Sequence, residues 1–200
     1  NSFYQRIRKD GQELREALLL ARPSIFFVQE VKLGADAPIA VKPGDGRLRD
    51  WSHPMVTKVN GRIEYELVSQ FMSELGYDRM FWSLSDQKYG GVAAFVYNTV
   101  ASPCRVFYHP EGKGHWPGRF LALEFSHFIC TTVYTPYCDG EDFSKRSPWD
   151  NALRNFARDV PKPVILMGDM NVNPTDADIG PGVAWHDGKF GCSEVEREGY

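Results

Sequence analysis

Two short apolar runs constrain the fold of this chain more than any other feature. They are residues 24–28 (SIFFV) and 164–167 (VILM), and neither shows the alternation of a half-exposed strand. Runs of this length, rich in branched and aromatic side chains, are typical of β-strands buried on both faces. Helical patterns at residues 12–21, 64–75 and 149–159 alternate with them. This alternation indicates a mixed α/β domain built around packed sheets.

A block of consecutive strands occupies the middle of the chain. Glycine and proline separate five strand-like segments there: residues 78–83, 91–97, 103–108, 119–125 and 128–134. The 200 residues suffice for one sizeable domain, which we assign to residues 1–200. Residues 34–62 are rich in glycine, proline and charge, and we interpret them as an inserted surface loop.

Composition narrows the classes of protein that remain. Hydrophobic residues at 42% and charged residues at 24% exclude a disordered chain, a collagen and a pure coiled coil. No run approaches the roughly 18 apolar residues of a membrane span, so we expect no membrane partner. A net charge of −3 argues against a strongly basic DNA-coating protein, although a nucleic-acid enzyme needs only a local basic face. Four cysteines without a C-x-x-C pair predict reduced thiols and an intracellular location.

Polar side chains follow both apolar runs. Glu30 comes after the first run, and Asp169 and Asn171 come after the second. Functional groups of open sheets gather at the carboxyl ends of strands, and hard cations need oxygen ligands from several such ends. Each site also has a simpler interpretation. Glu30 and Lys32 would form a solvated ion pair, and Gly-Asp would be a turn in which the carboxylate bonds locally to the backbone.

Tyr134 and two basic residues are further candidates. Tyr134 lies in the segment VYTPY, where its phenol could donate to a phosphate oxygen; the alternative is a half-buried aromatic at a sheet edge. Lys145 and Arg146 follow the same loop, and their charges suit contacts with a DNA backbone. The alternative for this pair is a solvated surface of mixed charge.

The chain resembles the exonuclease III/AP endonuclease family of the endonuclease/exonuclease/phosphatase superfamily. The most specific part is PVILMGDMNVNPTDADIG at residues 163–180, and SIFFVQEVK resembles the family strand that ends in Leu-Gln-Glu-Thr-Lys. Weaker pieces follow in the family's order: YGGVAAFV at residues 89–96, GRFLALEF at 118–125, TTVYTPY at 131–137, WDNALRNF at 149–156 and SEVEREGY at 193–200.

The resemblance implies an architecture and a site. The fold would be α/β, with two packed β-sheets flanked by helices in a four-layer sandwich. Glu30 would bind a divalent metal, Mg²⁺ or alternatively Mn²⁺, and Asn1 would lie near that metal. Tyr134 would contact the scissile phosphate. Asp169 would orient or activate the attacking water, and Asn171 would hydrogen-bond the phosphate.

The implied activity is metal-dependent cleavage of double-stranded DNA on the 5′ side of abasic sites, in base excision repair, by a monomer. A 3′-5′ exonuclease activity would accompany it. Two alternatives stay open: another phosphodiesterase or phosphatase of the superfamily, acting on RNA, phosphoinositides or sphingolipids, and a non-catalytic domain that kept the fold.

The chain also departs from the family pattern. Tyr137 stands where the family usually has Asn or Gln after Tyr-x-Pro. The family's later motifs, including the Ser-Asp-His that supplies a catalytic histidine, do not occur, and none of the five histidines has such a context. We therefore expect a domain truncated at both ends, and we expect residues 1–200 to be inactive alone.

Overall fold

The computed structural model describes residues 2–33, 59–85, 88–111, 116–138, 143–180 and 191–200. Four α-helices lie within this part of the chain: α1 (Phe3–Ala21), α2 (Val59–Glu74), α3 (Arg146–Asp159) and α4 (Glu194–Gly199). One sheet contains β1 (Ile25–Gln29), β2 (Arg79–Ser83) and β3 (Val92–Val96). The other contains β4 (Arg105–Phe107), β5 (Phe120–Glu124), β6 (Ile129–Tyr134) and β7 (Val164–Asp169).

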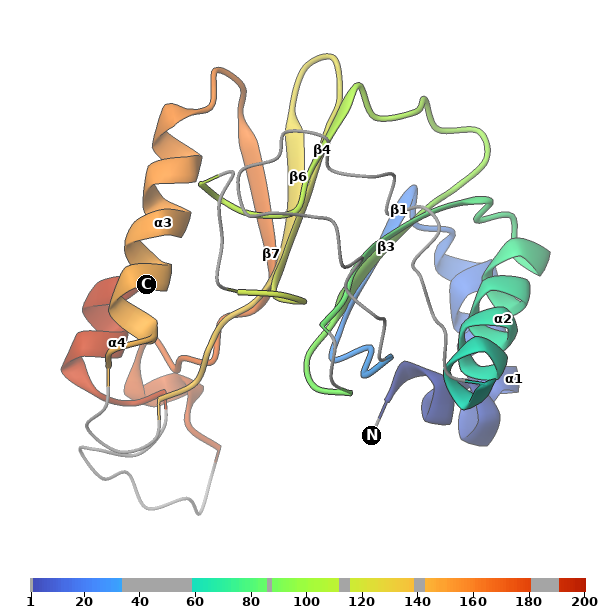
Figure 1. Cartoon of the computed structure of the whole chain (residues 1–200), viewed down its shortest axis with the longest axis horizontal. Coiled ribbons are helices and arrows are strands. Elements are labelled where there is room, and N and C mark those ends of the chain that lie inside the picture. The colour runs from blue at the N-terminus through green and yellow to red at the C-terminus, as the bar shows by residue number, and fades with distance from the viewer. Residues whose placement is uncertain (1, 34–58, 86–87, 112–115, 139–142, 181–190) are drawn as a thin grey trace.

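The two sheets pack face to face, with helices on their outer faces (Figure 1). Strand alternation explains the layers, because successive side chains of β3 point to opposite sides. Phe95 packs with residues of α1 and α2, whereas Val96 packs with Leu121 and Leu123 of the second sheet. On the outer face of that sheet, Phe120 packs against Phe156 of α3. The mixed α/β class predicted from the sequence is confirmed.

Strand order corrects one prediction from the sequence. The orders are β1-β3-β2 and β4-β5-β6-β7, so the two apolar runs form edge strands, and the strands buried on both faces are the central ones, β3, β5 and β6. Residues of β1 are only partly buried. In β7, Ile165, Leu166 and Met167 are 47%, 39% and 41% exposed. An apolar run marks a strand, but its burial depends on neighbours that the run itself does not specify.

Helix boundaries differ from the sequence patterns at two places. α1 begins nine residues before the predicted start, because Ser2 caps it by accepting a hydrogen bond from the backbone N–H of Gln5 at 3.3 Å. Non-helical backbone angles at Asp10 kink this helix and interrupt its apolar periodicity. The loop predicted at residues 34–62 lies mostly outside the described residues, and residues 59–62 form the first turn of α2.

Two further expectations concern thiols and membranes. Cys104, Cys130, Cys138 and Cys192 are free thiols, as the sequence predicts; the intracellular location stays a prediction. None of the helices in the described ranges has both the length and the apolar character to cross a bilayer.

Candidate functional site

The carboxyl ends of β1, β6 and β7 carry four of the predicted site residues: Glu30, Tyr134, Asp169 and Asn171. β6 and β7 are parallel, and their register pairs Tyr134 with Asp169. The N–H of Thr135 then donates to the carbonyl of Asp169 at 2.9 Å, which holds the two strand ends side by side. β1 of the other sheet contacts both β6 and β7. A hydrogen bond of 2.7 Å from Gln29 Nε2 to Thr132 Oγ1 ties the sheets together just before the site.

Glu30 lies in a loop that the backbone holds firmly. The N–H of Val31 donates to Gly91 at 3.0 Å, and that of Lys32 donates to Gly90 at 2.8 Å. Glu30 and Lys32 have positive φ angles of 52° and 54°. Residues other than glycine rarely adopt this backbone conformation, and those that do tend to cluster at functional sites.

The Glu30 carboxylate has two partners. Tyr134 donates its phenol to Oε1 at 2.6 Å, and Lys32 Nζ lies 2.5 Å from Oε2. The Lys32 and Tyr134 hydrogen bonds hold the pKa of Glu30 below its ordinary value. The Glu30 carboxylate therefore stays ionised, and it is paired with the Lys32 ammonium. The Glu30 side chain is 37% exposed. The ion pair between Glu30 and Lys32, which was the simpler interpretation of the sequence, is therefore present, and it lies beside the other site residues.

Tyr134 is 6% exposed and belongs to the core between the sheets. Its burial and its bond to Glu30 raise its pKa well above the ordinary value, so the phenol stays a neutral donor near pH 7. The Arg119 guanidinium lies 4.9 Å from the centre of its ring, and Arg119 Nη1 donates to the Tyr134 carbonyl at 3.0 Å. Sequence patterns missed Arg119, because its role depends on a ring 15 residues away along the chain.

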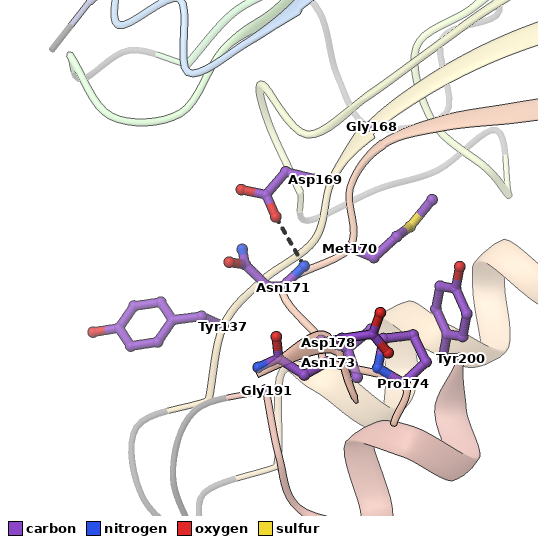
Figure 2. Close-up of a pocket in the computed structure, with 11 residues that line it drawn as sticks. Tyr137, Gly168, Asp169, Met170, Asn171, Asn173, Pro174, Asp178, Gly191 and Tyr200 are labelled. Carbon is purple, nitrogen blue, oxygen red and sulfur yellow. Dashed lines mark hydrogen bonds between the residues drawn. The ribbon is translucent and has the colours of Figure 1, made fainter. Parts of the chain in front are cut away.

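Asp169 is the last residue of β7, and Asn171 lies in the tight loop that follows. Asp169 Oδ1 accepts the backbone N–H of Asn171 at 2.9 Å (Figure 2). The amide of Asn171 donates to the Thr135 carbonyl at 2.6 Å, and its backbone has a φ of 47°. The local turn foreseen as the simpler interpretation is therefore present. Its bond fixes one carboxylate oxygen, while Asp169 as a whole remains exposed to solvent.

A cavity of about 540 Å³ opens beside this loop. Figure 2 shows Asp169 and Asn171 at its wall, with Tyr137, Asn173 and Asp178 around it. Tyr137, the departure from the family pattern, is 46% exposed there. The wall thus offers carboxylate, amide and phenol groups to a polar ligand.

Lys145 and Arg146 are adjacent in sequence but differ in placement. Lys145 is exposed and lines a second cavity of about 510 Å³ together with Arg119, Trp116 and Pro136. Arg146 is 2% exposed, and its Nε donates to both carboxylate oxygens of Asp150, at 2.9 and 2.8 Å. Burial raises the pKa of Asp150, and Arg146 opposes that rise.

The buried position of Arg146 does not suit the DNA contact expected from the sequence. A helical residue's environment depends on which way its side chain leaves the helix, and here that direction is inward. Asn1, the second predicted metal residue, lies outside the described residues. Within the described ranges, no three His, Cys, Asp or Glu side chains gather closely enough to hold a metal ion. The donor set still suits a hard cation, since Glu30 is ionised and offers oxygen.

Gly168 gives a first testable prediction, because this residue of β7 lies directly against β6 just before Asp169. Its φ is 138°, and an added Cβ would lie 2.2 Å from the carbonyl oxygen of Val133. Replacing Gly168 with alanine should lower the free energy of unfolding by about 3 kcal/mol or more, from overpacking and backbone strain. Urea unfolding measures this change.

Gly11 of α1 provides the matched control. An added Cβ there would meet Ile7 and Phe71 at 3.8 Å, which is ordinary contact. Gly11→Ala should stabilise the protein by about 0.5–1 kcal/mol, because alanine favours helix. Equal, small effects at both glycines would contradict the close approach of Gly168 to β6.

Comparisons with known proteins support a common origin for this arrangement. The sequence pattern of the Endonuclease/Exonuclease/phosphatase family matches residues 1–184. An Arabidopsis thaliana protein named DNA-(apurinic or apyrimidinic site) endonuclease is 28% identical over 189 residues, covering 90% of this chain and 50% of its own. The chain therefore spans half the length of that relative.

Solved structures give the same picture. A 3′-5′ exonuclease from Neisseria meningitidis superposes with a TM-score of 0.68 at 25% identity, over 100% of this chain and 65% of its own. A Neisseria 3′ phosphatase bound to a product DNA hairpin superposes with a TM-score of 0.67, also at 25% identity and over the same shares of both chains.

Proposed function

Because the chain belongs to the Endonuclease/Exonuclease/phosphatase family, we propose that the whole protein is a divalent-metal-dependent DNA phosphodiesterase of base excision repair. Its substrate is double-stranded DNA that contains an abasic site, cut on the 5′ side. The fold of the whole protein is the four-layer α/β sandwich expected from the resemblance.

One observation carries this proposal. Tyr134 connects Glu30, which follows β1 of the first sheet, with Asp169 of the second sheet. Its phenol donates to Glu30, and its backbone pairs with Asp169. The Glu30 carboxylate, which we propose binds the metal, thus lies beside a neutral donor, Tyr134, and Tyr134 pairs in turn with the strand residue Asp169. Phosphodiester hydrolysis needs these groups, since it builds negative charge on phosphate oxygens and takes a proton from water.

In the proposed reaction, the oxygen of water bonds to phosphorus and the bond from phosphorus to the 3′ oxygen breaks. Asp169 orients the water and accepts its proton through the carboxylate oxygen that does not bond to Asn171. The Asn171 amide donates its second N–H to a phosphate oxygen, and the Tyr134 phenol turns its single proton from Glu30 to another phosphate oxygen when the substrate binds. A bound Mg²⁺, held by Glu30, would neutralise charge on the phosphate. The departing 3′ oxygen takes up a proton from solvent water and becomes the 3′ hydroxyl, and Asp169 releases its proton to solvent.

A panel of substrates tests the proposal. The whole protein would be given a duplex with one abasic site, an intact duplex with a recessed 3′ end, single-stranded RNA and an inositol phosphate. Fastest cleavage of the abasic duplex supports the proposal, and release of 3′ nucleotides would add the exonuclease activity. Fastest turnover of RNA or the inositol phosphate would contradict it in favour of another superfamily activity. Failure to turn over any of the four would favour a non-catalytic domain.

Lys145 gives a prediction about DNA binding. It is exposed beside Arg119 at the second cavity, so we propose that it contacts a DNA phosphate. Lys145→Ala should weaken binding to all duplexes alike and make the slope of log K against log [salt] shallower by about 0.9, the share of one phosphate contact. Fluorescence anisotropy at several salt concentrations measures both quantities.

Arg158→Ala serves as the control. Lys145 lies at the start of α3, and Arg158 is an exposed cation near the other end of that helix. This variant should keep the slope of the unchanged protein. A Lys145→Ala slope equal to that of the control would remove Lys145 from the DNA interface.

A further inference from the structure

Arg146 joins the two loops that carry the candidate catalytic groups. Its Nη1 donates to the carbonyl of Asn171, after β7, at 3.2 Å and to the carbonyl of Pro136, after β6, at 3.4 Å. On its other side, Nε bonds to Asp150 one helical turn along α3. The guanidinium therefore connects helix α3 to both strand ends from behind the site.

The Asn171 backbone needs such support. Its φ of 47° lies in the left-handed region, which a non-glycine residue keeps only when its surroundings hold it. Arg146 donates to the backbone carbonyl of Asn171, and Asp169 accepts its backbone N–H. The carbonyl of Thr135 accepts a hydrogen bond from the side-chain amide of Asn171. Removal of the first contact leaves the other two to hold the loop alone.

We infer that Arg146 is a positioning residue, which sets the Asn171 loop, and through it Asp169, rather than contacting DNA. The expected loss of cleavage rests on the proposed function. The expected loosening of the Asn171 loop rests on the geometry alone. Only arginine fits the position, because its planar fork reaches Asp150 and two carbonyls at once, whereas lysine presents a single point charge.

The test compares Arg146→Lys with Arg154→Lys. Arg154 lies on the same helix but is exposed, and it bonds to Asn151 and to the carbonyl of Gly199. The first readout needs no DNA. In Arg146→Lys, amide hydrogen exchange at Asn171 should be at least about tenfold faster by NMR, while α2 amides keep their protection. Arg154→Lys should leave Asn171 unchanged, and unchanged exchange in Arg146→Lys would overturn the inference.

Kinetics provide the second readout. In Arg146→Lys, kcat for the abasic duplex should fall about 10–100-fold, the scale expected for a displaced catalytic group, while Kd and its salt dependence stay the same. In an Asn171→Ala background the same change should lower kcat by a smaller factor than in the unchanged protein, since the part of the effect that acts through the Asn171 side chain is already lost. A weaker Kd with a shallower salt slope would restore the direct DNA contact and contradict the positioning role.

The exchange and kinetic measurements distinguish failure of the proposed function from failure of the positioning role. If the whole protein cleaves no DNA, the proposed function fails, and the exchange rate at Asn171 still decides the positioning role. If Arg146→Lys does not fold, Asp150→Asn loosens the same guanidinium without removing it. Faster exchange at Asn171 in that variant supports the inference, and unchanged exchange contradicts it.

Discussion

Replacing Asp169 with asparagine is expected to lower the kcat for abasic-site cleavage by about 10²–10⁴-fold, the usual contribution of a group that transfers a proton. The substitution is conservative in structure. Asparagine keeps an oxygen that can accept the N–H of Asn171, so the turn after β7 can persist. What it loses is the negative charge and the ability to take a proton from water.

Single-turnover cleavage measures this effect, because it separates the chemical step from product release. Circular dichroism and the unfolding midpoint check that the fold persists. Asp159→Asn is the control, since Asp159 is an exposed carboxylate paired with Arg158 at the end of α3. It should cleave at the rate of the unchanged protein. A rate for Asp169→Asn within a fewfold of the control would remove Asp169 from the reaction.

Replacing Glu30 with glutamine is expected to raise the Mg²⁺ concentration for half-maximal activity at least about tenfold, because the site loses its ionised oxygen ligand. The shape of the side chain is preserved, and its carbonyl oxygen can still accept the Tyr134 phenol. Saturating Mg²⁺ should therefore restore part of the activity. A titration of cleavage rate against Mg²⁺ concentration gives the result.

Glu74→Gln provides the control for this second change. Glu74 is also a carboxylate paired with a cation, Arg15, at 2.6 Å, but it lies on the surface between α2 and α1. Its loss should not move the Mg²⁺ dependence. If Glu30→Gln required no more Mg²⁺ than Glu74→Gln, Glu30 would not be a metal ligand.

The sequence was sufficient to locate the strand ends and the acids that follow them. Glu30 and Asp169 were predictable because each follows an apolar run, and the parallel pairing of β6 with β7 then places Tyr134 beside Asp169. The burial of β1 and β7 was predicted wrongly, since an apolar run looks the same in an edge strand and in a central strand. β3, with two alanines among its five residues, is the central strand of its sheet.

Contacts between distant segments were not predictable. Arg119 stacks on Tyr134 because β5 and β6 are neighbours, and no spacing within either strand reveals this contact. Arg146 and Lys145 share a charge pattern, yet one faces the interior and the other faces solvent. The orientation of α3 on the sheet decides that difference, and it depends on packing of Trp149 and Phe156 that forms only in the folded protein.

Metal-dependent incision of an abasic duplex tests the central claim most directly. The whole protein would be incubated with a labelled duplex containing one abasic site, in Mg²⁺, in EDTA, and in EDTA followed by excess Mg²⁺. The account predicts one incision on the 5′ side of the abasic site in Mg²⁺, none in EDTA, and recovery when Mg²⁺ is restored. Incision that is equally fast in EDTA, or no incision in Mg²⁺, would contradict it.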